Sequence, residues 1–73
     1  MPLENVEAPL PGKILSVRAK PGDKIAEYDE ICVIEAMKME NPIVAPLSGI
    51  IKELKVSAGT IVKTGDILVS IEY

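Results

Sequence analysis

The hydrophobic positions of this chain fall into short runs that are rich in β-branched residues and interrupted by glycine or proline. Ten isoleucines and seven valines supply much of the apolar content, and β-branched side chains favour strands over helices. The glycines and prolines leave no window long enough for a stable amphipathic helix. Along residues 67–72, every odd-numbered position is isoleucine or valine, which predicts a half-buried strand whose even-numbered side chains face outward. The pattern predicts an all-β chain of short strands.

One motif occurs twice in the chain, 37 residues apart, with Ala8 aligned on Ala45 and Glu35 on Glu72 without a gap. The nine identical positions, numbered in the first copy, are Ala8, Pro9, Leu10, Gly12, Ile14, Gly22, Asp29, Ile34 and Glu35. Neither short copy can bury its own apolar face. Two copies therefore indicate two sheets packed face to face with pseudo-twofold symmetry, a flattened sandwich of about eight short strands.

The two copies also share irregular features. The alternation of apolar and polar positions breaks at Ile14 and Val17 in the first copy and at Ile51 and Leu54 in the second, which predicts a matching bulge or bend in each. Gly22 and Gly59 each follow an expected strand, and we expect both glycines to adopt a positive φ in matching turns. These shared features strengthen the interpretation of the chain as a duplicated β-unit.

The segment between the copies must reverse the chain, and a β-hairpin with Lys38 near its tip is the prediction. Two-residue hairpin turns favour Gly, Asn or Asp, yet Met37 and Lys38 hold the reversal point, and such departures tend to fall at functional sites. Met39 follows the lysine, so two methionines on a projecting turn indicate an exposed apolar surface for a partner. The spacing alone leaves open that Lys38 is an ordinary solvated lysine and that the methionines pack into the core.

Composition and charge exclude several classes of function. The net charge is −3, and the basic residues are scattered, so the chain lacks the clustered cations that nucleic acids require. There is no histidine, and Cys32 lies in an apolar run, which indicates a small buried thiol rather than a nucleophile. We therefore assign no catalytic residue and no metal ligand. A single cysteine fits a reducing compartment, so we expect the protein in the cytoplasm.

The sequence Glu35-Ala36-Met37-Lys38-Met39-Glu40, set between the two β-repeats, closely resembles that of the biotinyl domain family. This family includes biotin carboxyl carrier proteins and the carrier domains of biotin-dependent carboxylases, decarboxylases and transcarboxylases. The resemblance implies a barrel-sandwich hybrid of two four-stranded antiparallel sheets over residues 6–73, after a short N-terminal lead of residues 1–5. It also implies that Lys38 is biotinylated and that Glu35, Ala36, Met37 and Met39 form the flanking recognition motif.

The same resemblance implies a function as a non-catalytic carrier. Biotinyl-Lys38 would carry carboxyl groups from a biotin carboxylase or decarboxylase site to a carboxyltransferase site, after a biotin protein ligase has attached the cofactor. The implied partners are the ligase, the biotin carboxylase and the carboxyltransferase, with a membrane-bound decarboxylase complex as an open alternative. The acceptor substrate is not implied.

Two alternatives share the expected fold. Lipoyl domains also acylate a hairpin lysine, but that lysine usually follows an aspartate and precedes a small residue, whereas both neighbours of Lys38 are methionine. A purely structural barrel-sandwich hybrid, as in the membrane-fusion proteins of efflux systems, lacks a Met-Lys-Met tip. The gapless register of the repeat leaves no room for the protruding loop of some acetyl-CoA carboxylase carriers, so the chain resembles the simpler carrier type.

Overall fold

The computed structural model describes residues 2–73, which form eight strands and no helix. The strands are β1 (Leu3–Glu7), β2 (Gly12–Val17), β3 (Lys24–Ile25), β4 (Glu30–Ala36), β5 (Met39–Val44), β6 (Gly49–Leu54), β7 (Ile61–Val62) and β8 (Ile67–Glu72). One sheet has the strand order β1-β8-β6-β3 and the other β5-β4-β2-β7, and all pairings are antiparallel. The predicted all-β fold with two four-stranded sheets is confirmed. This part of the chain has no helix long and apolar enough to cross a membrane.

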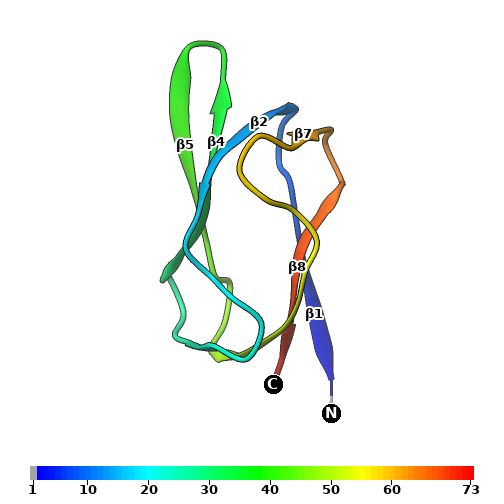
Figure 1. Ribbon diagram of the computed structural model, residues 1–73. Coiled ribbons are helices and arrows are strands. Elements are labelled where there is room, and N and C mark those ends of the chain that lie inside the picture. The colour runs from blue at the N-terminus through cyan, green and yellow to red at the C-terminus, as the bar shows by residue number, and fades with distance from the viewer. Residues whose placement is uncertain (1) are drawn as a thin grey trace.

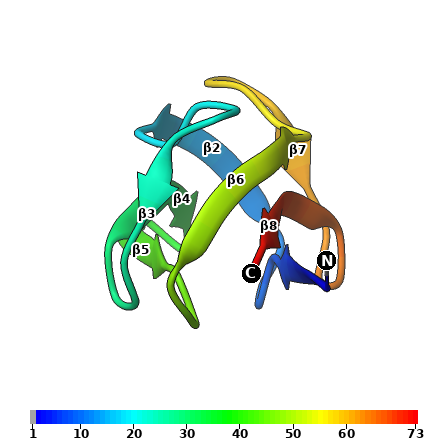
Figure 2. The same ribbon diagram turned by 90° about the horizontal axis from the view of Figure 1, so that it is seen from below.

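The sequence repeat explains the topology. A shift of 37 residues places β2, β3 and β4 on β6, β7 and β8, and places β1 on β5. Each sheet therefore takes two strands from each copy of the repeat, so the two copies are interlocked. Figure 2 shows the strands of both sheets surrounding one centre. In Figure 1 the hairpin of β4 and β5 projects from one end of the elongated molecule, and both termini lie at the other.

The predicted irregularities are confirmed in both halves. The register of the β2–β4 pair shifts between Ile14 and Ser16, and that of the β6–β8 pair shifts between Ile51 and Glu53. Gly22 and its counterpart in the second copy, Gly59, have φ angles of 91° and 96°. The bulges bend the central strands so that both sheets can wrap around the same core.

The apolar core lies between the sheets. Its largest fully buried side chains, which come from both copies, are Ile14, Ile31, Ile34, Ile51, Leu68, Ile71, Val62, Val69 and Cys32. Among residues 2–73, no buried side-chain nitrogen or oxygen lacks a hydrogen-bond partner. A domain of this size is only marginally stable, so an unsatisfied buried polar group would be costly.

The simple alternation predicted for residues 67–72 is wrong. Leu68 is fully buried, because the β1–β8 pairing skips it and the resulting bulge turns its side chain inward. Ser70 is also buried, and its hydroxyl donates a hydrogen bond of 2.8 Å to Asn5 Oδ1 on the neighbouring edge strand. The bulge and the edge strand depend on pairing partners far away in sequence, which a local pattern does not reveal.

Part of the predicted N-terminal lead, residues 1–5, lies in the first strand. Leu3, Glu4 and Asn5 belong to β1 and pair with β8 at the other end of the chain. The N-terminal segment is therefore part of the domain from Leu3 onward, and the rest of the predicted lead is Pro2, which lies outside the strands, and Met1, which lies outside the described residues. The short strand was missed because its partner is more than sixty residues away, as the pairing of Leu3 with Glu72 shows.

Cys32 is a buried core residue, as predicted. Burial, with a smaller contribution from the Glu30 carboxylate, raises the pKa of the thiol from 9.0 to about 11. Because the folded state favours the neutral thiol, its contribution to stability is fully present below pH 9 and is lost as the pH rises through 11. We expect the fall in unfolding free energy between pH 8 and pH 10.5 to be smaller in Cys32→Val than in the unsubstituted chain. Urea titrations at both pH values test this, and equal falls would contradict it.

Candidate functional site

The hairpin between β4 and β5 ends in a two-residue turn. Ala36 pairs with Met39, which leaves Met37 and Lys38 as the turn residues. Their φ angles are 54° and 63°, and two successive positive φ values define the type I′ turn, whose twist matches that of a hairpin. A side chain in this conformation costs roughly 1–2 kcal/mol per residue relative to the right-handed region. The predicted hairpin is confirmed, and the six cross-strand pairs below the turn hold it in place.

Both methionines at the tip lie in solvent. The side chains of Met37 and Met39 are 90% and 65% exposed, so the alternative in which they pack into the core is wrong. Lys38 is exposed between them, and neither of the two ion pairs formed within residues 2–73 includes it. The tip therefore presents a free primary amine flanked by apolar surface.

The other two motif residues differ in their surroundings. Ala36 is buried at the base of the turn, with 9% exposure, so it can influence recognition only through the position of the hairpin. Glu35 is exposed and pairs directly across the hairpin with Glu40, another carboxylate. Like charges in direct cross-strand positions are destabilising. The motif thus combines one packing residue with two exposed acids beside the lysine.

Two further residues support the hairpin. A Cβ atom at Gly12, on β2, would lie 2.6 Å from Ile34 Cγ2 and would also collide with the Glu35 carbonyl oxygen on β4. Only glycine allows β2 to approach the hairpin this closely. The Asn41 side-chain amide donates hydrogen bonds of 3.3 Å to the carbonyls of Ile34 and Met39, one on each strand. From the sequence, Gly12 was identified only as a repeated position. Asn41 was not identified, because no local sequence pattern marks it.

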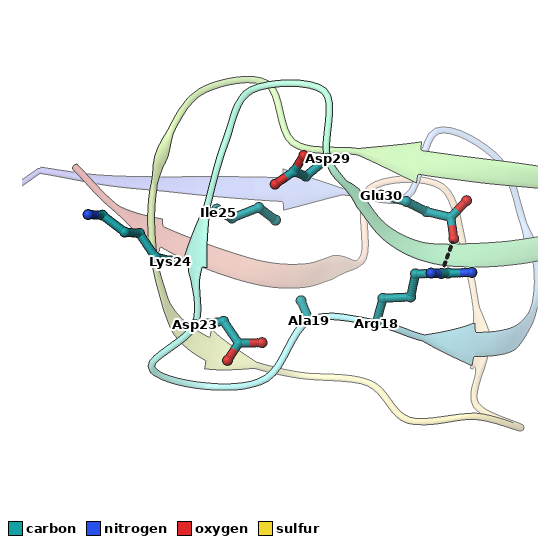
Figure 3. Close-up of a pocket in the computed structure, with 7 residues that line it drawn as sticks. All are labelled: Arg18, Ala19, Asp23, Lys24, Ile25, Asp29 and Glu30. Atoms are coloured by element: carbon teal, nitrogen blue, oxygen red, sulfur yellow. Dashed lines mark ion pairs between the residues drawn. The ribbon is translucent and has the colours of Figure 1, made fainter.

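The residues of the tip do not line the pocket found in the structure. This pocket, of about 290 Å³, is lined by Arg18, Ala19, Asp23, Lys24, Ile25, Asp29 and Glu30. In it, Arg18 Nε pairs with Glu30 Oε2 at 2.6 Å, as Figure 3 shows. The backbone of residues 18–30, which supplies this lining, lies toward the end of the molecule away from the hairpin tip (Figure 1). Within residues 2–73 no group of histidine, cysteine, aspartate or glutamate side chains could hold a metal ion.

Comparison with known proteins identifies the family. The Biotin_lipoyl family, described as biotin-requiring enzyme, matches residues 4–71. The chain belongs to this family. It is 48% identical over 67 residues to the human mitochondrial propionyl-CoA carboxylase alpha chain, a match that covers 92% of the chain and 9% of that protein. It is 42% identical over 66 residues to the Bacillus subtilis biotin/lipoyl attachment protein, which covers 90% of each.

The solved structures agree with this assignment. Kluyveromyces lactis urea carboxylase contains a region that matches 99% of the chain with a TM-score of 0.91 and 28% identity, and this region is 6% of the urea carboxylase chain. The chain thus spans less than a tenth of the length of the multidomain carboxylases that it matches. The chain is also 45% identical over 64 residues to the Streptococcus mutans biotin carboxyl carrier protein, a match that covers 88% of the chain and 49% of that protein.

Proposed function

We propose that Lys38 Nζ is the atom to which biotin is attached, and that the domain carries carboxyl groups on it between a carboxylating site and a carboxyltransferase site. The observation that carries this proposal is the type I′ turn that holds an exposed, unpaired Lys38 between two exposed methionines. A flexible side chain on a rigid hairpin fits a tethered cofactor, because the scaffold fixes its origin while the arm remains mobile. When attached, biotin accepts and releases a carboxyl group.

The chemistry required of Lys38 is that of a nucleophile toward an activated acyl group. A lysine amine is almost wholly protonated at neutral pH and does not attack a free carboxylate. A biotin protein ligase solves this by forming biotinyl-adenylate from biotin and ATP, with release of pyrophosphate. The Lys38 side chain gives up two protons as its nitrogen forms an amide bond to the acyl carbon, and the bond from that carbon to AMP breaks. The amide abolishes the charge of Lys38 and lengthens the side chain.

The neighbouring residues have supporting roles. Met37 and Met39 provide apolar contacts for the ligase and for the enzymes that use the carrier. Glu35 and Glu40 add negative charge beside the attachment point, and buried Ala36 fixes the base of the turn. Tethering replaces a diffusive encounter between cofactor and active site with an intramolecular one. The carrier can then serve two sites in turn, provided that it binds each of them weakly.

We further propose the cytoplasm as the location and a biotin carboxylase and a carboxyltransferase as partners. Relatives in which the matching region is part of a single long carboxylase chain support these partners. A decarboxylase complex that takes the carboxyl group from its substrate is the second candidate, since the same carrier chemistry serves it. Identifying the proteins that accompany the biotinylated chain on streptavidin distinguishes the two systems.

The direct test is biotin attachment itself. Incubation of the purified chain with a biotin protein ligase, ATP and biotin should add the mass of one biotin, and peptide mapping should place it on Lys38. A parallel incubation with a lipoate ligase and lipoate should add nothing. A chain that remains unmodified by the biotin ligase, or that is modified by the lipoate ligase alone, would overturn the proposal.

The turn provides a separate test of the tip methionines. Glycine at position 37 relieves the left-handed strain of Met37, so we expect Met37→Gly to be as stable as the unsubstituted chain or more stable, by up to about 1 kcal/mol. The same change removes an exposed apolar contact, so carboxyl transfer should become slower. Urea unfolding and transfer rates of fully biotinylated protein measure the two effects. Unchanged transfer would mean that Met37 has no role in recognition.

A further inference from the structure

Tyr28 occupies a backbone position that the second copy of the repeat gives to glycine. Its φ angle is 74°, and that of Gly65, 37 residues later, is 92°. The two turns make the same backbone contact, because Tyr28 N donates to the Ala45 carbonyl at 2.8 Å and Gly65 N donates to the Ala8 carbonyl at 2.9 Å. Glycine therefore satisfies this turn, and a tyrosine there carries left-handed strain that the fold does not require.

Packing within the chain does not offset that strain. The Tyr28 side chain is 75% exposed, more than any other large hydrophobic residue except Met37. An exposed aromatic ring held in a strained backbone conformation points to contact with another molecule, because strained residues cluster at ligand-binding positions and aromatic residues dominate the energetics of interfaces. Tyr28 and Met37 thus mark two separate exposed sites on the domain.

The pocket next to Tyr28 carries negative charge. The adjacent pocket is lined by three carboxylates, those of Asp23, Asp29 and Glu30, and by two cations, one of which is already paired with Glu30. Figure 3 shows Asp23 and Asp29 on opposite sides of this pocket. In the second copy the positions of Asp23 and Glu30 are held by Thr60 and Ile67. Two of the three acids are therefore specific to the first copy, whereas Asp29 is repeated as Asp66.

We propose that residues 26–29, which carry Tyr28, and the adjacent pocket form a docking surface for a partner protein whose contact face bears arginine or lysine side chains. A cationic group can stack on the Tyr28 ring, and a neighbouring cation can enter the pocket between Asp23 and Asp29. A cationic face is favoured over nucleic acid or an anionic membrane because the charge of this surface, like that of the whole chain, is negative.

The location fits a carrier, and this inference rests on the proposed function. The backbone of residues 18–30 lies toward the end of the molecule away from the hairpin tip (Figure 1). A subunit of the carboxylase complex that binds there leaves Lys38 free to reach an active site. The partner would hold the carrier near the enzyme active sites without itself occupying the hairpin tip.

The test measures binding in the absence of the biotin arm. In a Lys38→Arg background, the chain is titrated with purified cognate biotin carboxylase and, separately, with carboxyltransferase. The expected result is weak, salt-sensitive binding to one of them, which adding Tyr28→Gly weakens about tenfold, as loss of a cation–π contact predicts. Tyr28→Phe, which keeps the ring, and Tyr73→Ala, which removes the other exposed tyrosine, should bind as the background chain does.

Further measurements separate the possible outcomes. Tyr28→Gly in the otherwise unsubstituted chain should unfold at the same or a higher urea concentration and should accept biotin at the unchanged rate, which shows that the proposed function is intact. Glu27→Gln should reduce the dependence of binding on salt. Binding to either enzyme that is unaffected by Tyr28→Gly, or weakened equally by Tyr73→Ala, or absent for both enzymes, would overturn the proposed docking surface.

Discussion

Lys38→Arg is expected to abolish biotin attachment completely and to leave the domain folded. Arginine preserves the length and the positive charge of the side chain, but its guanidinium is always protonated and cannot act as the nucleophile. Because Lys38 is exposed and makes no ion pair within residues 2–73, its replacement should change the unfolding free energy by less than about 0.5 kcal/mol. Intact mass after incubation with ligase, ATP and biotin measures the first effect, and urea unfolding measures the second.

Lys63→Arg is the matched control. This lysine is also exposed, but it follows β7 and is not at a hairpin tip, so the variant should accept one biotin at the unchanged rate. Biotin found on another lysine of Lys38→Arg would show that the ligase does not depend on the hairpin. A Lys38→Arg chain that unfolds would show that the lysine has a structural role. Either result contradicts the assignment of Lys38.

Much of the fold could be predicted because the same sequence pattern occurs twice in the chain. The repeat aligned Gly22 with Gly59 and Ile14 with Ile51, and the structure has matching turns and bulges at these positions. The tip at Lys38 could be predicted for a different reason. The segment between the copies must reverse the chain, which predicts a hairpin there, and the absence at Met37 and Lys38 of the residue types that a two-residue turn prefers indicated a functional position.

The features that could not be predicted depend on contacts between different strands, which no local sequence pattern contains. The position of Leu3 in the domain is set by β8, and the inward turn of Leu68 is set by a bulge in that same pairing. Asn41 gives no local signal, because its role depends on a carbonyl on the neighbouring strand. The left-handed conformation of Tyr28 was not predicted, although the repeat aligns this residue with Gly65, which also has a positive φ.

The two interlocked copies also make possible a comparison of the hairpin with its symmetry-related counterpart. Gly12 packs against β4 as Gly49 packs against β8, and a Cβ atom at either would lie 2.6 Å from an isoleucine Cγ2, that of Ile34 or Ile71. The same atom would collide with a carbonyl oxygen, that of Glu35 or Glu72. Position 12 therefore touches the strand that leads to Lys38, and position 49 touches a strand remote from it.

Gly12→Ala and Gly49→Ala should each lower the unfolding free energy by about 1–3 kcal/mol, because the added methyl group overpacks a contact that includes backbone. That loss is a large fraction of the stability of so small a domain. Only Gly12→Ala should also slow biotin attachment, since relief of its clash must displace β4 and with it the turn at Lys38. Urea unfolding measures the first effect, and ligase kinetics at a temperature where both variants are folded measure the second. Equal ligase rates for the two variants would show that attachment tolerates movement of the hairpin, and unchanged stability would show that the sheets can separate at these glycines without cost.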